Sequence, residues 1–443
     1  MLYIMDYTQL SRNELLSICK EFNIGYFSKE KKSELINKIN DYHDLHKPKT
    51  IKFIDLFCGI GGFHQALTRN KNFECVMACD IDEKCRETYF ENYGILPEKD
   101  IKNVNEKDIP DFDILTAGFP CQTFSNAGKK GNLSDKRGQL FEDILRIANE
   151  KKPKLMFLEN VKHIKRIDNG KTFEHIIKRI NETGYYVKDH ETIFELSPHQ
   201  LGIPQQRERV IFVCIRNDIY DKNKVIELNI PNIEIDLSKI LESDTNITQK
   251  YRISTELENI LNIWNEMIYK FDVGETLSPT ILCNEFQKQY TEDEFASLVS
   301  WKQDYIKKNK PLYQKYKSNW DEWLEKYRDI LNKREIYCKL EWQVGKKKKN
   351  DSIWNYFIQF RQSGIRVKKA HYFPTLVAIV QTPIFAAEKR YITPRECARL
   401  QSFPDSFIMH KSDNIAYKQF GNAVNVDVVG FVMNNVLKLY NFI

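Results

Sequence analysis

Residues 53–63 read Phe53-Ile54-Asp55-Leu56-Phe57-Cys58-Gly59-Ile60-Gly61-Gly62-Phe63, an apolar run that leads into a glycine-rich turn. Such a turn between a strand and a helix lets the backbone approach a nucleotide-like ligand and points helix N–H groups at it. The fingerprint G-x-G-x-x-G of NAD-binding folds is incomplete, because His64 stands at the third glycine position. The stretch alone therefore predicts a strand–turn–helix unit, and a tight turn without a ligand stays open as an alternative.

Short apolar runs alternate with helical patterns around this turn. The predicted strands are 51–57, 75–79, 114–117, 155–158 and 210–215. This rhythm is typical of a parallel, doubly wound α/β sheet with helices on both faces, and we expect it to form one domain over 51–215. Over 216–390 the rhythm gives way to long charged helical stretches and irregular segments. A helical pattern returns from Thr393 to the end of the chain.

Composition excludes several classes of protein. The 443 residues are 42% hydrophobic and 29% charged, which is typical of a globular protein and too apolar for a disordered one. Mean hydropathy is -0.52, and no apolar stretch reaches the roughly 18 residues that span a bilayer. The start of the chain lacks the basic region of a signal peptide. Ten cysteines without a CxxC pair indicate a reducing cytoplasm, and cysteines and histidines lack metal-ligand spacing, so we expect no metal.

Positive charge is concentrated in one part of the chain. The net charge is +6, and residues 301–350 hold fifteen Lys/Arg against seven Asp/Glu. All six tryptophans lie between Trp264 and Trp354, and the run Lys346–Lys349 is expected to mark a loop. A basic, aromatic-rich segment indicates a surface that faces a polyanion. Composition fits equally well a solvated helical face with its tryptophans in a small core.

The first fifty residues predict two short helices. Apolar stripes run through Leu10, Leu15 and Ile18 and again through Leu35, Ile36 and Ile39, with Ser11 and Ser33 as the expected N-caps. Over residues 1–46 this pattern resembles a SAP-type helix-extension-helix DNA-binding motif, followed by a linker at 43–50. The alternative is that the stripes pack on the large domain as a structural strap.

A candidate nucleophile follows the third predicted strand. That strand runs into Phe119-Pro120-Cys121-Gln122-Thr123-Phe124-Ser125 at the carboxyl edge of the sheet, where ligands bind such folds. Nearby amides can lower the pKa of a cysteine there, so Cys121 is a plausible thiolate. The polar stretch 126–138 predicts a loop that can close over a substrate. A buried structural cysteine is the alternative, which we expect for Cys58, Cys75, Cys79, Cys85 and Cys214.

Charged residues follow other predicted strands. Asp80 ends the second strand and can accept hydrogen bonds from ribose hydroxyls, and Asp100 could bind an adenine amino group. Glu159 ends an apolar strand, where a carboxylate is costly unless it is paired or functional. Arg207 and Arg209 share one face of an extended segment and could both hold a base or a phosphate, or they could stabilise a sheet edge in salt bridges.

The order and spacing of these stretches resemble the DNA (cytosine-5) methyltransferase family. The turn 57–62 resembles the family's S-adenosylmethionine-binding turn, and Pro120-Cys121-Gln122 resembles its nucleophile motif. Glu159-Asn160-Val161 and Gln205–Arg209 resemble two further blocks, and Pro394–Leu400 and Gly421–Val424 resemble the last two. Thr123 departs from the commoner proline or alanine. Thr375-Leu376 resembles a short pattern near the end of the variable segment.

The resemblance implies a doubly wound, mixed α/β sheet of the S-adenosylmethionine-dependent methyltransferase (Rossmann-like) type, with a smaller target-recognition domain and a small helical N-terminal module. The implied parts are the module 1–46, the catalytic domain 51–215, the target-recognition domain 216–390 and a returning segment 391–443. The implied catalytic residues are Cys121, Glu159, Arg207 and Arg209. The implied cofactor-binding residues are Phe57, Gly59, Ile60, Gly61, Gly62, Asp80, Ile81, Asp100, Ile101, Pro120, Asn422 and Val424. The implied DNA-binding residues are Gln122, Ser125, Gln205, Thr375 and Leu376.

The expected reaction moves a methyl group from S-adenosyl-L-methionine to carbon 5 of a flipped-out cytosine in duplex DNA and leaves S-adenosyl-L-homocysteine. We expect a cytoplasmic monomer that does not bind membranes and is paired with a separately acting restriction endonuclease. Three alternatives remain: an RNA cytosine methyltransferase, a non-catalytic DNA-binding regulator with the same fold, and a nicotinamide oxidoreductase. The long segment 216–390 and the SAP-like arm disfavour the first, Cys121 and Glu159 disfavour the second, and His64 disfavours the third.

Overall fold

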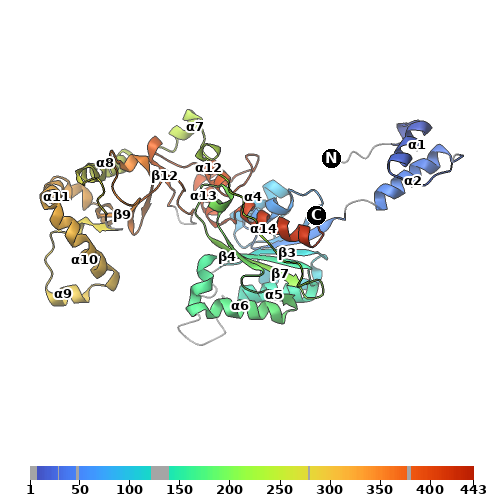
Figure 1. Cartoon of the computed structure of the whole chain (residues 1–443), viewed down its shortest axis with the longest axis horizontal. Helices are drawn as coiled ribbons and strands as arrows, with labels where there is room; N and C mark the ends of the chain where they lie inside the picture. Colours follow the sequence, from blue (N-terminus) through green and yellow to red (C-terminus); the bar gives the residue numbers. More distant parts are fainter. Residues whose placement is uncertain (1–6, 28, 46–48, 121–138, 278–279, 377–380) are drawn as a thin grey trace.

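The computed structural model describes the chain except for residues 1–6, 28, 46–48, 121–138, 278–279 and 377–380. Figure 1 shows three parts: a pair of N-terminal helices, a large body built on one sheet, and a smaller body built on a second sheet. The segment 216–390, called the insert below, first runs along the large body, where Ile219, Leu228 and Ile240 pack on its core, and forms the smaller body from Ile253 onward. The last 50 or so residues return to the large body.

The first sheet has seven strands in the described residues. These are β1 (Ile51–Leu56), β2 (Phe73–Cys79), β3 (Ile114–Gly118), β4 (Leu155–Val161), β5 (Tyr185–Tyr186), β6 (Ile193–Leu196) and β7 (Arg209–Arg216). Their order is β2-β1-β3-β4-β7-β5, and β6 also pairs with β7. The first four strands are parallel, whereas β7 runs antiparallel to β4. The expectation of a mixed doubly wound sheet is confirmed, but the parallel rhythm predicted as far as residue 215 ends at β4.

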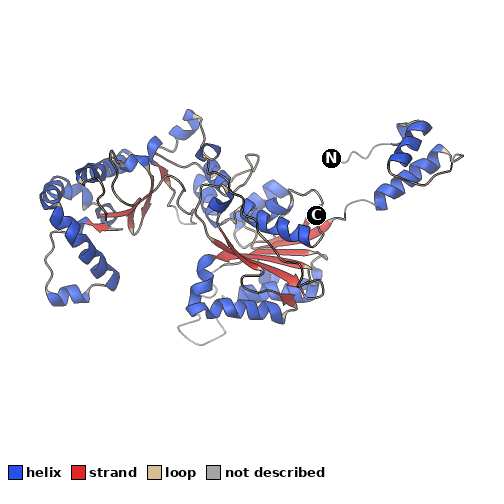
Figure 2. Ribbon diagram, viewed as in Figure 1, coloured by secondary structure: helices blue, strands red, loops and turns tan. Residues whose placement is uncertain are grey.

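Helices cover both faces of this sheet (Figure 2). On one face lie α3 (Gly62–Leu67) and α14 (Val426–Leu439); on the other lie α5 (Gln139–Lys151) and α6 (Lys171–Glu182). Side chains alternate along a strand, so Leu155 and Phe157 pack toward α14, and Met156 and Leu158 pack toward α5. Among the described residues, no helix combines the length and apolarity needed to cross a membrane.

The remaining helices of the large body frame the edge at which the parallel strands end. They are α4 (Glu83–Tyr93), α12 (Pro394–Leu400) and α13 (Asp413–Asn422). Thr393 caps α12 through a capping box with Glu396, and Asp82 caps α4. The helical pattern predicted from Thr393 onward is confirmed.

The insert holds a second sheet that the sequence did not predict. In the described residues it comprises β8 (Ile281–Leu282), β9 (Lys339–Gln343), β10 (Phe357–Arg361), β11 (Gly364–Lys368), β12 (Ile384–Phe385) and β13 (Arg390–Tyr391). Its helices are α7 (Thr245–Gln249), α8 (Thr255–Lys270), α9 (Glu292–Ser297), α10 (Ser300–Lys315) and α11 (Lys317–Leu331). Strands of two to five residues are too short to show a clear period of two, which explains why only the helices were expected.

The tryptophans of the insert form its core. Trp264, Trp320 and Trp323 are buried and lie in edge or tilted contact with one another, and Trp342 is buried beside them in the same cluster. Trp301 is exposed. Most tryptophans therefore stabilise the fold of the insert and do not face a ligand. Within the predicted basic loop, Lys347 is buried and donates to the Lys348 carbonyl, so the run 346–349 is only partly a solvated surface.

The N-terminal helices α1 (Arg12–Glu21) and α2 (Lys32–Leu45) pack on each other. Leu15, Cys19, Leu35 and Ile39 form a small buried core between them. Ser11 caps α1 in a capping box with Glu14, as predicted. The predicted cap at Ser33 is wrong, because α2 begins one residue earlier and the Glu34 carboxylate accepts the Lys31 amide instead.

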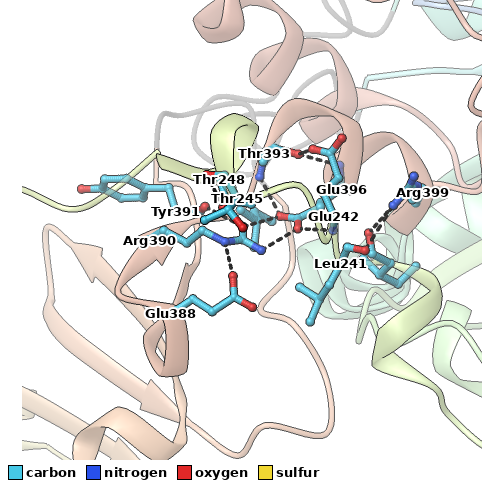
Figure 3. A network of polar contacts seen from close by, with 12 residues as sticks. Leu241, Glu242, Thr245, Thr248, Glu388, Arg390, Tyr391, Thr393, Glu396 and Arg399 are labelled. Atoms are coloured by element: carbon cyan, nitrogen blue, oxygen red, sulfur yellow. Dashed lines mark hydrogen bonds and ion pairs between the residues drawn. The ribbon is translucent and has the colours of Figure 1, made fainter. Parts of the chain in front are cut away.

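A buried ion-pair network joins the end of the insert to the large body (Figure 3). Both guanidinium ends of Arg390, at the start of β13, donate to the Glu396 carboxylate of α12 at 2.8 Å. Both side chains are almost completely buried. Glu396 also accepts the Glu242 amide, and the Thr393 hydroxyl donates to Glu242. The segment entering the insert and the strand leaving it therefore meet on one helix.

We expect Glu396→Ala to lower the free energy of unfolding by about 3–5 kcal/mol, because it leaves two buried donors of the Arg390 guanidinium without a carboxylate. Arg390 then keeps only the partly exposed Glu388 as a charged partner. The matched control is Glu87→Ala, which breaks the exposed Lys84–Glu87 pair and should cost no more than about 1 kcal/mol. Urea unfolding followed by tryptophan fluorescence measures both. Equal losses in the two variants would contradict a structural role for the network.

Candidate active site

The turn after β1 has the backbone geometry that its glycines predict. Gly59 and Gly61 have positive φ angles of 53° and 83°. A Cβ on Gly61 would lie 2.3 Å from the ring of Tyr93, and one on Gly62 would lie 2.5 Å from Val424. The glycines therefore allow α3 to pack closely against α4 and against the returning C-terminal segment. This packing brings the predicted residues 57–62 next to Val424.

Two acidic residues lie behind this turn. Asp80 accepts the Gly59 amide at 2.7 Å and the Asp82 amide at 2.8 Å, and burial raises its pKa despite these bonds. Asp55, at the end of β1, is fully buried, and the Thr116 hydroxyl donates to its Oδ1. Burial raises the pKa of Asp55 to about 8. Within the described chain its Oδ2 has no hydrogen-bond partner. The turn therefore adjoins two acidic side chains that are shielded from solvent.

The other predicted cofactor residues lie around the same edge. The apolar side chain of Ile81 is 73% exposed directly after Asp80. Asp100 caps a short 3₁₀ helix by accepting the Lys102 amide, and Ile101 is buried beneath it. Phe57 is half-buried with a φ of 53°, Ile60 is buried, and Pro120 and Asn422 are exposed. His64 is a core histidine that is hydrogen-bonded to Tyr89, and burial lowers its pKa to about 4.

Glu159 and Arg209 form an ion pair at the end of β4. Arg209 Nε lies 2.8 Å from Glu159 Oε1, and both side chains are largely buried. In the antiparallel register Arg209 lies opposite Val161, which places it diagonally from Glu159 on the same face of the sheet. Gly118 pairs with Glu159 and also approaches Val424. The carboxylate thus adjoins the segment that reaches the glycine turn.

Arg207 occupies a different position from its predicted one. Its guanidinium donates to the carbonyls of Leu376, Gly421 and Ala423 at 2.8, 3.0 and 3.0 Å. Burial, with the nearby charge of Arg209, lowers its pKa. All of these acceptors are backbone atoms, so Arg207 joins three segments of the chain. These contacts favour a positioning role for Arg207, and its catalytic role stays a prediction.

The predicted DNA-binding residues of the described chain are mostly buried. Gln205 is fully buried, and within the described residues neither atom of its amide has a partner, so a surface contact with a duplex does not fit its position. Its neighbour Gln206 is exposed and accepts a hydrogen bond from Lys368. The Thr375 hydroxyl donates to the Gln206 carbonyl, and Leu376 is buried. Thr375 and Leu376 therefore fasten the insert to the segment that carries the arginines.

Several predicted residues lie outside the described part of the chain: Cys121, Gln122, Ser125 and the predicted closing loop 122–138. The nine described cysteines are all buried, which confirms the structural role predicted for Cys58, Cys75, Cys79, Cys85 and Cys214. Burial raises the pKa of Cys75 and of Cys79 to about 12, and it also raises the pKa of Cys58. These thiols are protonated at neutral pH and cannot act as nucleophiles.

Two residues at this edge were not singled out from the sequence. Asn160 donates to the Phe119 carbonyl at 2.9 Å and thereby ties the turn after β3 to the end of β4. Asp55 is the second, and the signal for it was available: a carboxylate within the apolar run 53–57, the same pattern that indicated Glu159.

The sequence model for "C-5 cytosine-specific DNA methylase" matches residues 51–438. The chain belongs to this family. The Type II methyltransferase M.HhaI of Haemophilus parahaemolyticus is 32% identical over 392 residues, covering 88% of this chain and 96% of that protein. M.BanI of Aneurinibacillus aneurinilyticus is 32% identical over 435 residues, covering 88% and 97%. The S. pombe Dnmt2 methyltransferase has the same fold, with a TM-score of 0.50 at 21% identity over 88% of this chain and 98% of that one.

The cytosine-5 DNA methylase family implies S-adenosylmethionine as the methyl donor, and the described residues fit it. The exposed Ile81 offers an apolar surface for a ring next to Asp80, whose carboxylate can accept from ribose hydroxyls. A Cβ on Gly59 would meet nothing within 4 Å, so there is room beside the turn. Oδ2 of Asp55 is a buried polar atom without a hydrogen-bond partner among the described residues, so a polar group of this cofactor can bind it.

We expect Arg207→Lys to weaken cofactor binding and to lower the free energy of unfolding by about 2–4 kcal/mol, because one ammonium cannot reach all three carbonyls. Arg209→Lys is the matched variant and should lower turnover while affinity and stability change little. Three measurements distinguish the two variants. Calorimetric titration with S-adenosylhomocysteine gives the affinity, urea unfolding gives the stability, and single-turnover rates give the turnover. Loss of turnover in Arg207→Lys with unchanged affinity and stability would restore the catalytic role first predicted.

Proposed function

We propose that the chain methylates carbon 5 of a cytosine that is flipped out of duplex DNA. The observation that carries this proposal is the buried Glu159–Arg209 ion pair. Glu159 adjoins Gly118, and Val424 contacts both Gly118 and the glycine turn. This supports a carboxyl group and a cation beside the proposed cofactor site. The residues proposed to hold the cofactor are those of the turn 57–62 with Asp80, Ile81, Asp100, Ile101, Pro120, Asn422 and Val424.

Carbon 5 of cytosine is a weak nucleophile, so the ring must first be activated. In the proposed reaction the Cys121 thiolate adds to carbon 6, and Glu159 gives a proton to ring nitrogen 3 as negative charge develops. The bound S-adenosylmethionine supplies an electrophilic methyl group. Carbon 5 takes this methyl group and the sulfur keeps the electrons of the broken bond. Loss of the carbon-5 proton then lets the electrons of that C–H bond re-form the ring double bond as the Cys121 thiolate leaves, and the proton on ring nitrogen 3 returns to Glu159.

Arg209 has two roles in this scheme. Its guanidinium holds Oε1 of Glu159, which fixes the orientation of the carboxyl group, and it can stabilise the oxygen of the bound base. Asn160 holds the carbonyl of Phe119, two residues before Cys121, so β4 also positions the chain that leads to the nucleophile. Arg207 acts only through the segments that it joins.

The insert is the proposed target-recognition domain, and the parts 51–215 and 391–443 form the proposed catalytic domain. Thr375 and Leu376 lie where the insert meets the arginine segment, so we assign them to positioning of the insert. Gln122 and Ser125 stay proposed DNA contacts. Because M.HhaI and M.BanI are named Type II methyltransferases, we propose that a separate restriction endonuclease recognises the same site, and that the protein acts as a cytoplasmic monomer.

Cys121→Ser should abolish methyl transfer, because a hydroxyl provides almost no anion at neutral pH. The wild type should form a covalent complex with DNA that contains 5-fluorocytosine, and the variant should not. Glu159→Gln is the companion variant and should slow turnover by roughly 10²–10⁴-fold with little change in DNA affinity. Denaturing gel electrophoresis detects the complex. A trapped complex in Cys121→Ser would overturn the assignment of the nucleophile.

The helices α1 and α2 form the proposed SAP-like DNA-binding module. Their core side chains pack on each other, and Figure 1 shows the pair apart from the two sheets. This packing favours a tethered module over a strap that covers the large body. Phe27 is 77% exposed beside Lys29 and Lys31, which are also exposed, and these side chains offer a surface for a DNA backbone.

Deletion of residues 1–46 should weaken DNA binding and leave the melting temperature, the methylated sequence and the turnover at saturating DNA unchanged. A tethered contact raises local concentration without touching the chemistry. Lys29→Gln/Lys31→Gln in the full chain should reproduce part of the loss. A thermal scan and a DNA titration on each protein measure the two effects. A lower melting temperature with unchanged affinity would show that the helices are a strap.

A further inference from the structure

The helix α10 carries a dense group of positive charges. Residues 300–317 contain six lysines and a single acidic residue, Asp304. Three of these lysines form ion pairs: Lys302 with Glu285, Lys315 with Glu275, and Lys317 with Asp321. For Lys307, Lys308 and Lys310 no ion pair forms with any described carboxylate, and all three are exposed. Called the α10 lysine face below, these three residues form a cationic surface.

The α10 lysine face is held in a fixed orientation. Asn309, which lies between Lys308 and Lys310, is buried; its Oδ1 accepts the Leu282 amide at 2.7 Å and its Nδ2 donates to the Thr280 carbonyl at 2.8 Å. Leu312 and Tyr316 are buried farther along the chain. The helix is therefore fastened to β8, and its lysines are presented by a rigid element.

Lys307 and Lys310, which are three residues apart on the helix, repel each other, which costs a few tenths of a kcal/mol. Partial compensation comes from aromatic rings: Lys307 lies over Phe295 at 5.5 Å and Lys308 over Tyr305 at 5.9 Å. A cavity of about 800 Å³ adjoins the face, and Lys307, Lys310, Phe295 and Tyr313 are among its lining residues. The surface next to the lysines is thus hollowed and can accept a polyanion chain more closely than a flat face.

The position of α10 relates this surface to the active site. The insert is bound to the edge that carries Glu159 and Arg209, because Gln206 contacts both Lys368 and Thr375. Figure 1 shows α9 and α10 at the end of the second sheet that points away from the large body. A duplex rises about 34 Å in ten base pairs, so DNA bound at this edge can extend past the helix.

We propose that Lys307, Lys308 and Lys310 bind backbone phosphates of duplex DNA beyond the methylated site. This proposal rests on the proposed function, since it takes the insert to face DNA. The contact increases affinity and is independent of sequence, because phosphates carry no base identity. A DNA backbone carries evenly spaced charge, at one negative charge per about 3.4 Å of each strand. This regular spacing makes DNA a better partner for three closely spaced lysines than an acidic protein segment would be.

The test is the variant Lys307→Gln/Lys308→Gln/Lys310→Gln, compared with the wild type and with Lys71→Gln/Lys107→Gln/Lys222→Gln. The control removes the same charge from exposed lysines that precede β2 and β3 or follow β7, at the edge opposite the active site. Fluorescence anisotropy gives the Kd for a duplex that carries the methylated sequence, which bisulfite sequencing identifies, over a series of KCl concentrations.

Each phosphate contact contributes about 0.9 to the slope of log Kd against log salt, so the variant should lose about 2–3 from that slope. Its turnover at saturating DNA and its methylated sequence should not change, and the control should keep the full slope. Lys307→Arg/Lys308→Arg/Lys310→Arg should also keep the slope, since it keeps the charge. A slope equal to that of the wild type would overturn the proposal, as would an equal loss in the control.

Failure of this proposal is distinguishable from failure of the proposed function. A wild-type protein that methylates DNA and forms the 5-fluorocytosine complex, with a variant of unchanged slope, would overturn only the lysine contact. A wild-type protein without either activity would overturn the function. A changed methylated sequence in the glutamine variant would show that the α10 lysine face reads bases, which also overturns the proposal.

Discussion

The buried guanidinium of Arg207 holds together segments that are far apart in the chain. Its three acceptors, the carbonyls of Leu376, Gly421 and Ala423, lie 169, 214 and 216 residues away. One acceptor lies in the insert and the other two flank Asn422, next to Val424. The Ala423 carbonyl also accepts a hydrogen bond from Gln401 at 3.3 Å, whereas Arg207 is the side-chain donor to the carbonyls of Leu376 and Gly421. Buried carbonyls without donors are costly, so this one side chain links the insert to the proposed cofactor segment.

The second constraint is the alternation of side chains along the parallel strands. Phe53 and Asp55 point to one face of the sheet, as do Leu155, Phe157 and Glu159, and that face carries α3 and α14. The carboxylates of β1 and β4 thus emerge on the side where Gly62 and Val424 meet. A register shift of one residue would move Glu159 to the face of α5 and separate it from Arg209. The chemistry of this DNA cytosine-5 methyltransferase depends on that parity.

Charge is treated differently in the two bodies. In the large body, charges at the active edge are buried and paired or held dry, as for Glu159 with Arg209 and for Asp55. At the junction, Arg390 and Glu396 are buried together and fix the two ends of the insert on α12 (Figure 3). The insert instead exposes cations along α10, where solvent makes them inexpensive and a polyanion can reach them.

The sequence by itself determined the α/β class, the strand–turn–helix unit at 51–67, the buried carboxylate at the end of β4 and the order of the family's blocks. Each of these depends on local periodicity or on a short motif, and such signals are complete within a few residues. Only the tertiary structure decides which arginine pairs with Glu159. Arg207 and Arg209 are equivalent in the sequence, and they differ because the Arg207 guanidinium binds the carbonyls of the distant residues Leu376, Gly421 and Ala423. The tertiary structure also decides that Gln205 and Lys347 are buried and that Lys307, Lys308 and Lys310 are not neutralised. Burial and ion pairing depend on contacts between distant segments, and composition along the chain does not contain them.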